Sequence, residues 1–422
     1  MTLTKKPVTG MKDILPAEMQ IRDYVTGLVR ETYEAFGFTP IETPAVEHIG
    51  NLLSKQGGEN EKLIFKILKR GEKLVLSPDV SEEDLADSGL RYDLTLPLSR
   101  FYACHASELP SPFKALQMGS VWRADRPQKG RFRQFVQCDI DILGDPTSLA
   151  ETELITATTT LLGKLGFSDF TVRINDRRIL KAMAASCGFE EKEFDTVFII
   201  LDKMDKIGIE GVREELTGCG FAKECVDRYI AMFEDDTSSD AYLPALSQMV
   251  SEYLEEGCAE SLSGIIKSVE RVKSHDFNIV FDPTLVRGMS YYTGTIFEIT
   301  MNEFGSSVAG GGRYDEMIGK FTGNKVCACG FSIGFERIIT ILLEQGFKVP
   351  SSRTKYAFLI EKGADPGFIA DVMEKASLLR ANGDCVLVSM MNKNKKFQKE
   401  QLEKDGFSSD NITEFYHSDF RN

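Results

Sequence analysis

The sequence predicts an α+β protein: a main body with a mixed or antiparallel sheet, a helical insertion within it, and a small α/β domain at the end. Two strand patterns flank a basic loop between Lys114 and Gly144, and an apolar periodicity of three to four residues runs through 177–275. After Pro350, strand and helix patterns alternate. The length fits two or three domains of about 100–200 residues each. We expect a main body at 1–350, interrupted by the insertion at about 177–275, and a separate domain at 355–422.

The first element is a helix after Pro16, because apolar side chains recur there at helical spacing and Gly37 supplies a stop signal. The next stretch, FTPIETPAVEH, is strand-like but contains Pro40 and Pro44, which fit an irregular strand at a sheet edge. Strand-forming residues return from Leu63 to about Leu76. The segment RYDLTLPLSRFY then leads into another helix.

The later elements follow the same logic. Ser148 with Glu151 predicts a capping box for a helix that extends through Leu165. Beyond the insertion, FNIVFDPTLV and SYYTGTIFEIT are strand-like, and AGGGRYDEM is predicted to be a glycine turn. A strand, KVCACGFSIG, and an apolar helix, FERIITILLEQG, complete the main body. The last domain is expected to run strand, helix (368–382), strand, short helix, strand.

The composition is that of a globular protein, with 42% hydrophobic and 27% charged residues. No run approaches the roughly 18 apolar residues that span a bilayer, and the N-terminus lacks the apolar core of a signal peptide. A cytoplasmic protein without membrane contact is therefore expected. The nine cysteines are scattered and odd in number, which argues against a disulfide framework. Cys327 and Cys329 are predicted to be core thiols, and no metal site made of protein side chains is predicted.

Common nucleotide-binding motifs are missing, because no GxGxxG follows a first strand and no GxxxxGK[ST] occurs. Cations instead crowd the loop between two predicted strands, with only Asp125 to offset them. They are Arg123, Arg126, Lys129, Arg131 and Arg133. Arginine forks match phosphate oxygens bidentately, which suits a polyanion such as ATP. A solvated hairpin tip is the plainer alternative.

Polar residues follow this loop on the second strand. Gln137, Asp139 and Asp141 share one face, because side chains alternate along a strand. An amide and carboxylates side by side can hold an α-ammonium group. For each residue alone, an exposed strand position is equally expected.

Two more arginines lie at strand or strand–helix positions. Arg287 enters an aromatic strand, where a buried guanidinium needs an anionic partner. Arg337 opens a helix directly after a strand and is expected to be half-buried. Gly310–Gly312 permit close approach of a ligand, although a turn is the simpler interpretation. With Arg123, these arginines provide the phosphate clamp that an ATP site on an antiparallel sheet needs in place of a P-loop.

These residues resemble the class II aminoacyl-tRNA synthetases, and within them the histidyl-tRNA synthetases, over nearly the whole chain. The first helix with FTPIETPAVE resembles motif 1, the dimer-interface element; VWRADRPQKGRFRQFVQCDIDILG resembles motif 2; and GFSIGFERI resembles motif 3. RYDLT, RPQKGRFRQF, RGMSYYTGTIFE and GGGRYD narrow the resemblance to the histidyl enzymes. It implies an antiparallel catalytic domain with a helical insertion and a short anticodon-binding-like α/β domain.

The resemblance also implies roles for matched positions. For ATP, Arg123 would grip the α-phosphate, Phe135 would stack on adenine, and Arg337 would flank the adenine and the γ-phosphate. For histidine, Asp93, Thr95, Gln137 and Asp141 would surround the ammonium group, and Tyr292 and Tyr314 would line the imidazole pocket. Arg287 would neutralise charge between the histidine carboxylate and the α-phosphate.

The implied reaction joins histidine and ATP into histidyl-adenylate and then transfers the histidyl group to the 3′ end of tRNA(His). Mg²⁺ would bridge the phosphates, and a homodimer is expected. The tRNA contacts expected are Gln128, Lys129 and Arg131 in the motif 2 loop and, from the distribution of charge, Lys393 and Lys396. No nucleophilic side chain is needed, since the carboxylate attacks phosphorus in line and positioning and charge stabilisation do most of the catalysis.

The chain departs from the family pattern at several points. Ser290 stands where the RGxDYY segment usually has an acid, Asp125 stands where Glu is commoner, and Asp93 replaces the glutamate of the RPEGT segment. The last domain ends soon after EFYHSDFRN and is shorter than the usual anticodon-binding domain. One alternative is a catalytically silent relative, the synthetase-like regulatory subunit of ATP phosphoribosyltransferase. Another is a histidine- or nucleotide-binding module without turnover.

The formal charge of −14 argues against a general nucleic-acid binder, but it is unevenly distributed. Between Arg228 and Lys267 no basic residue occurs, and the eight acidic residues there contribute more than half of the net charge. The stretch at 393–404 instead gathers lysines. We therefore expect the acidic part of the insertion to face away from bound RNA, leaving the motif 2 loop and the lysine stretch to meet it.

Overall fold

The computed structural model describes residues 3–53, 60–77, 80–126, 132–234, 241–286, 291–301, 306–350 and 353–420. They divide into two compact units, Met1–Ile14 with Arg22–Gln345 and Leu15–Ile21 with Gly346–Asn422. Each unit is built around its own sheet. In the described part of the chain, no helix is long and apolar enough to cross a membrane.

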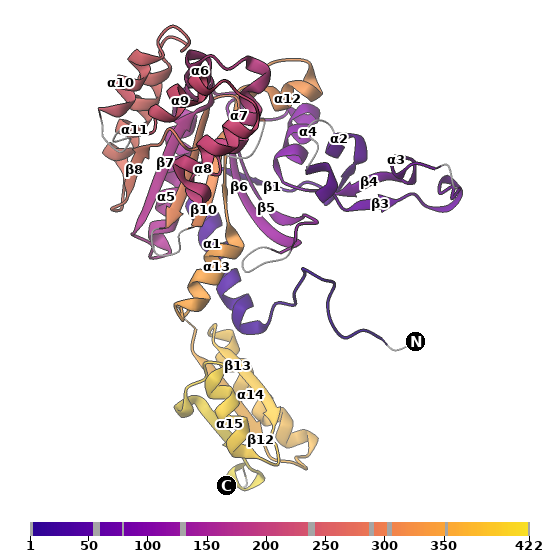
Figure 1. The fold of residues 1–422 in the computed structure, drawn as a ribbon. Helices are drawn as coiled ribbons and strands as arrows, with labels where there is room; N and C mark the ends of the chain where they lie inside the picture. Colours follow the sequence, from indigo (N-terminus) through magenta and orange to yellow (C-terminus); the bar gives the residue numbers. More distant parts are fainter. Residues whose placement is uncertain are drawn as a thin grey trace. The chain divides into compact units, whose positions relative to one another are not determined.

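The larger unit is organised by a sheet to which the described residues contribute eight strands (Figure 1). In spatial order they are β1 (Thr39–Ile41), β5 (Phe113–Trp122), β6 (Gln134–Leu143), β11 (Ala328–Ile333), β10 (Ser306–Arg313), β9 (Thr295–Met301), β7 (Phe170–Asp176) and β8 (Asn278–Phe281). Neighbours from β5 to β7 are antiparallel, whereas the outermost pairs, β1 with β5 and β7 with β8, are parallel. The prediction of a mixed or antiparallel sheet is confirmed, and the sheet is of the mixed kind.

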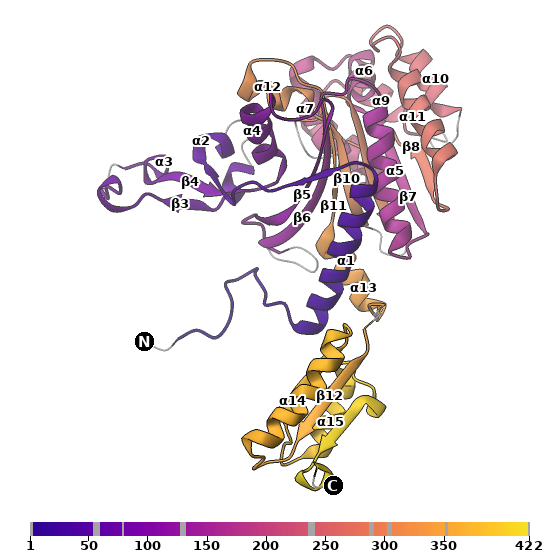
Figure 2. The same ribbon diagram turned by 180° about the vertical axis from the view of Figure 1, so that it is seen from behind.

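Strand β6 shows how the sheet separates the core from the polar face. Its alternate residues Cys138, Ile140 and Ile142 are almost fully buried. Helix α5 (Leu149–Lys164) packs against β6 and β11, and α11 (Cys258–Val272) packs against β7 and β8 (Figure 2). The intervening residues of β6 are polar and point to the opposite face, because side chains alternate along a strand.

The predicted insertion is helical. Its described helices are α6 (Arg177–Cys187), α7 (Phe194–Leu201), α8 (Met204–Gly218), α9 (Lys223–Ala231), α10 (Tyr242–Met249) and α11. They gather beside β7 and β8 in Figure 1. Asp176 caps the first of them, since its side chain accepts a hydrogen bond from the Arg178 backbone N–H, and Gly188 ends it with φ 98°.

The N-terminal elements follow the sequence prediction only in part. Helix α1 (Pro16–Ala35) is followed by Gly37 with φ 80°, as expected. The strand predicted across 63–76 is mostly wrong, because only three residues form a strand, β3 (Lys66–Leu68). It pairs with β4 (Ala86–Leu90), which lies between β3 and β2 (Val46–His48) in a three-stranded sheet. Helix α4 (Thr95–His105) then leads into β5.

Two local predictions are corrected. The glycine turn is instead the middle of β10, where Gly311 pairs with Phe331 so closely that an added Cβ would lie 2.0 Å from the Gly330 carbonyl oxygen. The capping box is absent, because Ser148 makes no side-chain cap and the Glu151 carboxylate binds the guanidinium of Arg313 at 2.7 and 2.8 Å. Cys329 is buried as predicted, and Cys327 is partly exposed.

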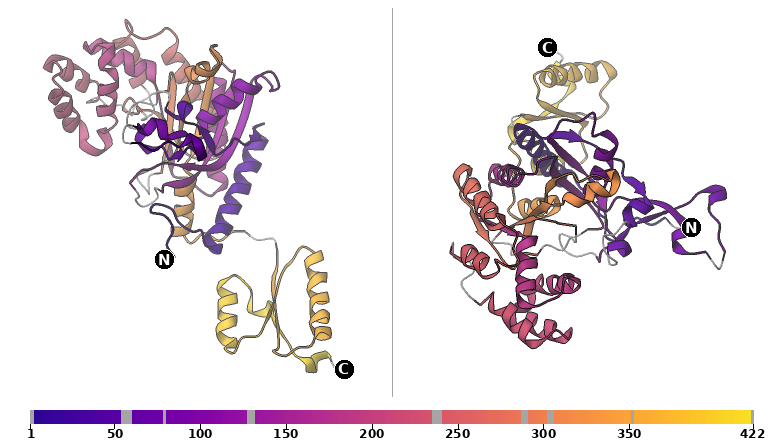
Figure 3. Two further views of the ribbon diagram at one scale, coloured as in Figure 1. Left: turned by 90° about the vertical axis from the view of Figure 1, so that its right-hand side faces the viewer. Right: turned by 90° about the horizontal axis from the view of Figure 1, so that it is seen from above.

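The smaller unit contains a parallel sheet in the order β13 (Cys385–Met390), β12 (Lys355–Ile360), β14 (Ile412–Phe415). Helices α14 (Pro366–Ala381) and α15 (Lys395–Lys404) lie on opposite sides of it (Figure 3). Each face buries its own apolar cluster, one containing Phe358 and Phe415 and the other containing Leu359 and Leu402. The predicted strand–helix alternation is confirmed.

Candidate active site

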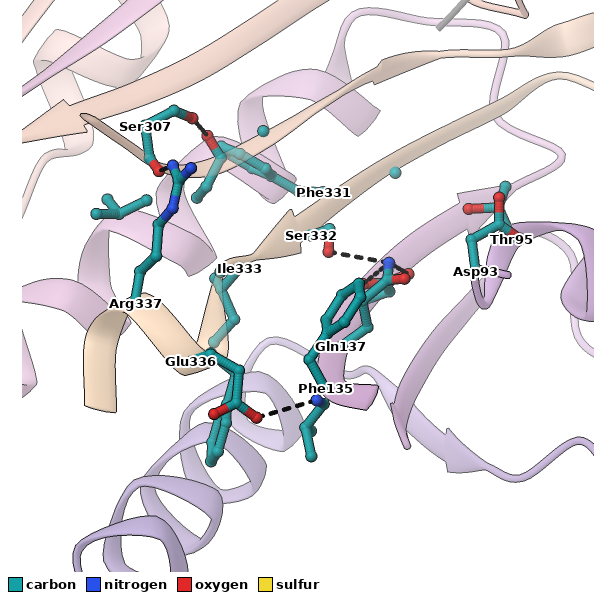
Figure 4. Close-up of a pocket in the computed structure, with 18 of the residues that line it drawn as sticks. Asp93, Thr95, Phe135, Gln137, Ser307, Phe331, Ser332, Ile333, Glu336 and Arg337 are labelled. Carbon is teal, nitrogen blue, oxygen red and sulfur yellow. Dashed lines mark hydrogen bonds between the residues drawn. The ribbon is translucent and has the colours of Figure 1, made fainter. Parts of the chain in front are cut away.

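A cavity of about 540 Å³ opens over the polar face of the large sheet, where β6, β10, β11 and the start of α13 (Phe335–Glu344) meet (Figure 4). Nine residues predicted to bind ATP or histidine line it: Asp93, Thr95, Arg123, Phe135, Gln137, Asp141, Tyr292, Tyr314 and Arg337. They come from segments more than 240 positions apart in sequence, so only the folded sheet brings them together.

The remaining predicted residues are not among the described residues that line this cavity. Arg287, Ser290, Gln128, Lys129 and Arg131 lie outside the described residues. Lys393 and Lys396 are exposed in the smaller unit. Of the remaining loop cations, Arg126 is exposed, and Arg133 donates to the backbone carbonyls of Asp125 at 3.1 Å and Thr9 at 3.5 Å. The loop base is therefore tied to the N-terminal segment through Arg133.

Asp141 of β6 is one of the buried acids that line the cavity. Its carboxylate is 2% exposed, and Oδ1 accepts a hydrogen bond of 2.6 Å from the Tyr314 hydroxyl. Oδ2 is buried without a hydrogen-bond partner in the described structure. Burial, followed by the nearby Asp139, raises the pKa of Asp141 well above its ordinary value. This oxygen is therefore available to a donor on a bound ligand.

Glycine makes room for that carboxylate. Gly330 of β11 lies directly opposite Asp141 in the strand register. A Cβ at this position would lie 2.0 Å from Asp141 Oδ1. In β10, a Cβ on Gly312 would lie 2.9 Å from Cδ1 of Tyr292. The glycines thus form a flat floor beneath the acidic and aromatic side chains, which explains their place inside strands.

Gln137 and Asp139 form a buried pair beside Asp141. Gln137 Nε2 lies 3.2 and 3.0 Å from the two carboxylate oxygens of Asp139 and 3.4 Å from Ser332 Oγ. The side chains of Gln137 and Asp139 are 9% and 3% exposed, so the alternative of exposed strand positions is wrong. The carboxylates cluster with Asp93, which is also buried, and the cavity therefore favours a cationic ligand.

The loop before α4 supplies Asp93 and Thr95. Asp93 Oδ1 accepts a hydrogen bond of 3.1 Å from the Leu96 backbone N–H, which fixes the carboxylate at the start of the helix. Thr95 is the first residue of α4, and it is buried like Asp93. Both side chains are labelled at one side of the cavity in Figure 4.

Arg123 lies at the mouth of this acidic region. Its Nε donates to the Tyr92 carbonyl at 3.1 Å, and its Nη2 lies 3.4 Å from Gln137 Oε1. The guanidinium sits between two rings, 4.3 Å from the Tyr92 centroid and 5.1 Å from the Phe135 centroid. These contacts fix the guanidinium next to the polar cluster, where an anion bound beside an ammonium group would meet it.

The opposite end of the cavity is formed by α13. Glu336 Oε1 accepts a hydrogen bond of 3.2 Å from the Val136 backbone N–H, next to Phe135. The same carboxylate pairs with Arg22 of α1. Arg337 Nη1 donates to the Ser307 carbonyl, which directs its side chain along β10 toward the cavity rim (Figure 4). The prediction that Arg337 is half-buried is confirmed.

Two residues that line the site, Glu336 and Ser332, were not predicted from the sequence. Asp139 was predicted, with Gln137 and Asp141, to be able to hold an α-ammonium group, but the resemblance assigned it no role in histidine binding. Glu336 directly precedes Arg337 in GFERI, and its place in this motif 3 segment was the signal that could have found it. Ser332 gives no sequence signal, because its place depends on the pairing of β11 with β6.

The fold is that of a class II aminoacyl-tRNA synthetase, with a mainly antiparallel sheet that carries arginines, buried acids and glycines on one face. The model of a family described as histidyl-tRNA synthetase matches residues 10–338. This chain belongs to the histidyl-tRNA synthetase family. It is 47% identical over 346 residues to the histidine–tRNA ligase of Leifsonia xyli subsp. xyli, covering 80% of each chain. It is 40% identical to the probable histidine–tRNA ligase of Tropheryma whipplei (strain Twist), covering 96% of this chain and 94% of the relative.

Solved structures agree. The histidyl-tRNA synthetase of Nostoc sp. PCC 7120 superposes with a TM-score of 0.76 at 29% identity, covering 96% of this chain and 90% of that chain. A Bacillus halodurans protein described as an ATP phosphoribosyltransferase regulatory subunit/histidyl-tRNA synthetase superposes with a TM-score of 0.75 at 21% identity, covering 98% of both. The second likeness shows the fold alone. The prediction of an aminoacyl-tRNA ligase of the histidine type is confirmed, and the regulatory-subunit alternative is not better supported.

Proposed function

We propose that the cavity binds histidine and ATP, forms histidyl-adenylate and then charges tRNA(His). The observation that carries this proposal is the position of Arg123, 3.4 Å from Gln137 and beside the buried acids. A cationic clamp next to an ammonium-binding corner suits a substrate with a positive amino group and a carboxylate that reacts with phosphate. In the reaction, a histidine carboxylate oxygen forms a bond to the α-phosphorus, the bond to the β-phosphate breaks, and pyrophosphate leaves.

Each lining residue takes a role in this proposal. Asp93, Thr95, Gln137 and Asp141 receive the donors of histidine, and Tyr292 and Tyr314 enclose its imidazole ring. Phe135 stacks on adenine, Arg123 holds the α-phosphate, and Arg337 holds the adenine and the γ-phosphate. Arg287 bridges the histidine carboxylate and the α-phosphate. Because none of these groups acts as a nucleophile, catalysis comes from positioning and charge.

Mg²⁺ would accompany ATP and supply charge neutralisation on the phosphate oxygens. Among the described residues, no group of three or more His, Cys, Asp or Glu is arranged to hold a metal. The ion would be held mainly by nucleotide oxygens and water, since Mg²⁺ commonly keeps waters and phosphates as ligands. A cytoplasmic homodimer that contacts tRNA through Gln128, Lys129, Arg131, Lys393 and Lys396 completes the proposal.

The test is histidine-dependent ATP–pyrophosphate exchange, followed by aminoacylation of tRNA with histidine against other amino acids. Purified protein is expected to exchange with histidine alone. Arg287→Ala is expected to reduce adenylation by orders of magnitude while keeping the thermal midpoint. Exchange no greater than background would contradict the proposed enzyme, and a wild-type rate in Arg287→Ala would contradict the role of that arginine.

A further inference from the structure

The amide of Gln137 is held from one side. All of its close contacts at Nε2 are acceptors: both oxygens of Asp139, at 3.2 and 3.0 Å, and Ser332 Oγ, at 3.4 Å. Asp139 and Ser332 are direct partners in the register of β6 and β11, so backbone pairing fixes their separation. The other end of the amide, Oε1, lies 3.4 Å from Arg123 Nη2.

This arrangement selects one of two amide orientations. A glutamine amide has a donor end and an acceptor end, whereas an ammonium group and a guanidinium have donors only. In the flipped orientation, Oε1 would meet the Asp139 carboxylate and Nε2 would meet Arg123, so both contacts would become repulsive. Asp139 therefore keeps the acceptor end on the side of the cavity that faces Arg123.

We propose that Asp139 is a positioning residue for the amino-acid substrate, which orients Gln137 so that Oε1 accepts a hydrogen bond from the α-ammonium group. Its carboxylate also adds negative charge behind that contact. The inference rests on the proposed function, because it takes Gln137 as a ligand of the substrate amino group. Ser332 of β11 makes a smaller contribution, since its hydroxyl contacts both Gln137 and Asp139.

The charged surroundings of Asp139 make its role sensitive to pH. Burial raises the pKa of Asp139 to about 7; a hydrogen bond from Ser332 lowers it and the charge of Asp93 raises it. The titratable and charged groups around it are Asp93 ahead of α4, Asp141 on β6, Arg123 after β5, Arg91 after β4, and Tyr291, with Cys138 and Tyr33 of α1 also within electrostatic range. The carboxylate gains charge as the pH rises from 6 to 8, which strengthens attraction for a cation.

The test compares Asp139→Asn with wild type in histidine-dependent ATP–pyrophosphate exchange. Asparagine keeps the size of the side chain and one acceptor oxygen but removes the charge and can present its own N–H₂ to Gln137. We expect KM for histidine to rise about ten-fold or more, because a charge-assisted contact is lost, with KM for ATP changed less than about two-fold. Ser332→Ala keeps the charge and should raise KM for histidine by only about three-fold.

Two inhibitors separate orientation of the amino group from general disturbance of the pocket. Histidinol keeps the ammonium group and the imidazole ring, whereas imidazolepropionate lacks the ammonium group. In Asp139→Asn, the inhibition constant of histidinol should rise by the same factor as KM for histidine, and that of imidazolepropionate should stay within about two-fold. Asp276→Asn, at a fully exposed side chain, is the matched control.

The pH profile gives an independent readout. In wild type, KM for histidine should fall between pH 6 and 8, and in Asp139→Asn the fall should shrink to the part caused by the imidazole of free histidine, whose pKa is about 6.5. An unchanged KM and pH profile in the variant, or equal weakening of both inhibitors, would overturn the inference while leaving the proposed function intact. A wild-type protein without histidine-dependent exchange would overturn both.

Discussion

Arg22 and Glu336 form a bidentate ion pair, with Nη1 to Oε2 at 2.7 Å and Nη2 to Oε1 at 2.8 Å. Both side chains are 9% exposed, and the Arg22 guanidinium also lies 4.9 Å from the Phe335 ring centroid. Because Glu336 Oε1 accepts the Val136 N–H as well, the pair connects α1 and α13 to the strand that carries the site.

Glu336→Ala should therefore destabilise the protein. The change leaves the Arg22 guanidinium buried without its carboxylate, which typically costs about 3–5 kcal/mol. The free energy of unfolding in urea measures it, and KM for ATP should rise because the Val136 amide loses its acceptor beside Phe135. The double variant Arg22→Met with Glu336→Met should recover much of the stability. Equal stability of Glu336→Ala and wild type would contradict the structural role of the pair.

Gly330→Ala should disable histidine activation. Its Cβ would lie 2.0 Å from Asp141 Oδ1 and 3.2 Å from Tyr314 Cε1, so the carboxylate and the ring must shift. Misplacement of about 1 Å at a reacting site can lower the rate about 100-fold, and we expect a loss of this order in kcat/KM for histidine. Gly264→Ala in α11, where an added Cβ meets nothing within 4 Å, is the control and should be neutral or stabilising by about 0.5–1 kcal/mol. Similar kinetics for both variants would contradict the prediction.

Tyr314→Phe should weaken histidine binding while keeping the ring. The variant removes the hydroxyl that donates to Asp141 at 2.6 Å and that lowers the pKa of this carboxyl. The pKa of Asp141 should rise further, the carboxylate should be less charged at neutral pH, and KM for histidine should increase about ten-fold. Steady-state exchange kinetics at pH 7 and pH 9 measure this, with partial recovery expected at the higher pH. A variant with wild-type KM at both pH values would exclude a role for this hydrogen bond.

Asp139 should make the stability of the fold depend on pH. Its pKa rises from 3.8 to about 7 on folding, mainly through burial, so the folded chain binds a proton that the unfolded chain has released. The contribution of this group to stability is therefore fully present below pH 3.8 and is lost as the pH rises to about 7. Asp139→Asn should exceed wild type in stability by about 1–4 kcal/mol at pH 8, and by less at pH 5. Chemical denaturation at the two pH values would show a constant difference if the shift were wrong.

Charge reversal of Lys393 and Lys396 should weaken tRNA binding without affecting ATP–pyrophosphate exchange. Both side chains are exposed beside the exposed ring of Phe397, a combination that suits contact with a nucleic-acid backbone and bases. Each lost phosphate contact lowers the magnitude of the slope of log K against log salt by about 0.7–0.9, so loss of two lysine contacts should lower it by about 1.4–1.8. Lys223→Glu, at an exposed position of α9, is the control. Unchanged affinity at low salt would refute this contact.

The order of most helices and strands could be predicted from the periodicity of apolar residues and from the positions of glycine and proline. The helix after Pro16, the hairpin of β5 and β6, the helical insertion and the strand–helix alternation after Pro350 each follow from local pattern. Two wrong predictions came from interpreting the composition of a short segment without its tertiary partners. The segment 63–76 has strand composition but forms little regular structure, and Gly310–Gly312 have turn composition but lie in a strand. For Gly310–Gly312, pairing with β9 and β11 overrode the local turn preference; most of 63–76 found no strand partner in the described structure.

The sequence by itself determined the family and the kinds of side chain available to the site, because the motifs that contain Arg123, Gln137, Asp141 and Arg337 resemble those of the family. Only the tertiary structure decided how they cooperate. The register of β6 with β11 sets Asp139 opposite Ser332 and Gly330 opposite Asp141, and the approach of α13 to α1 pairs Glu336 with Arg22. These contacts join residues nearly 200 to more than 300 positions apart, and no local pattern encodes the distance between such atoms. The physical reason is that strand pairing and helix packing, which are set by burial across the whole unit, fix which polar groups share a low-dielectric cavity.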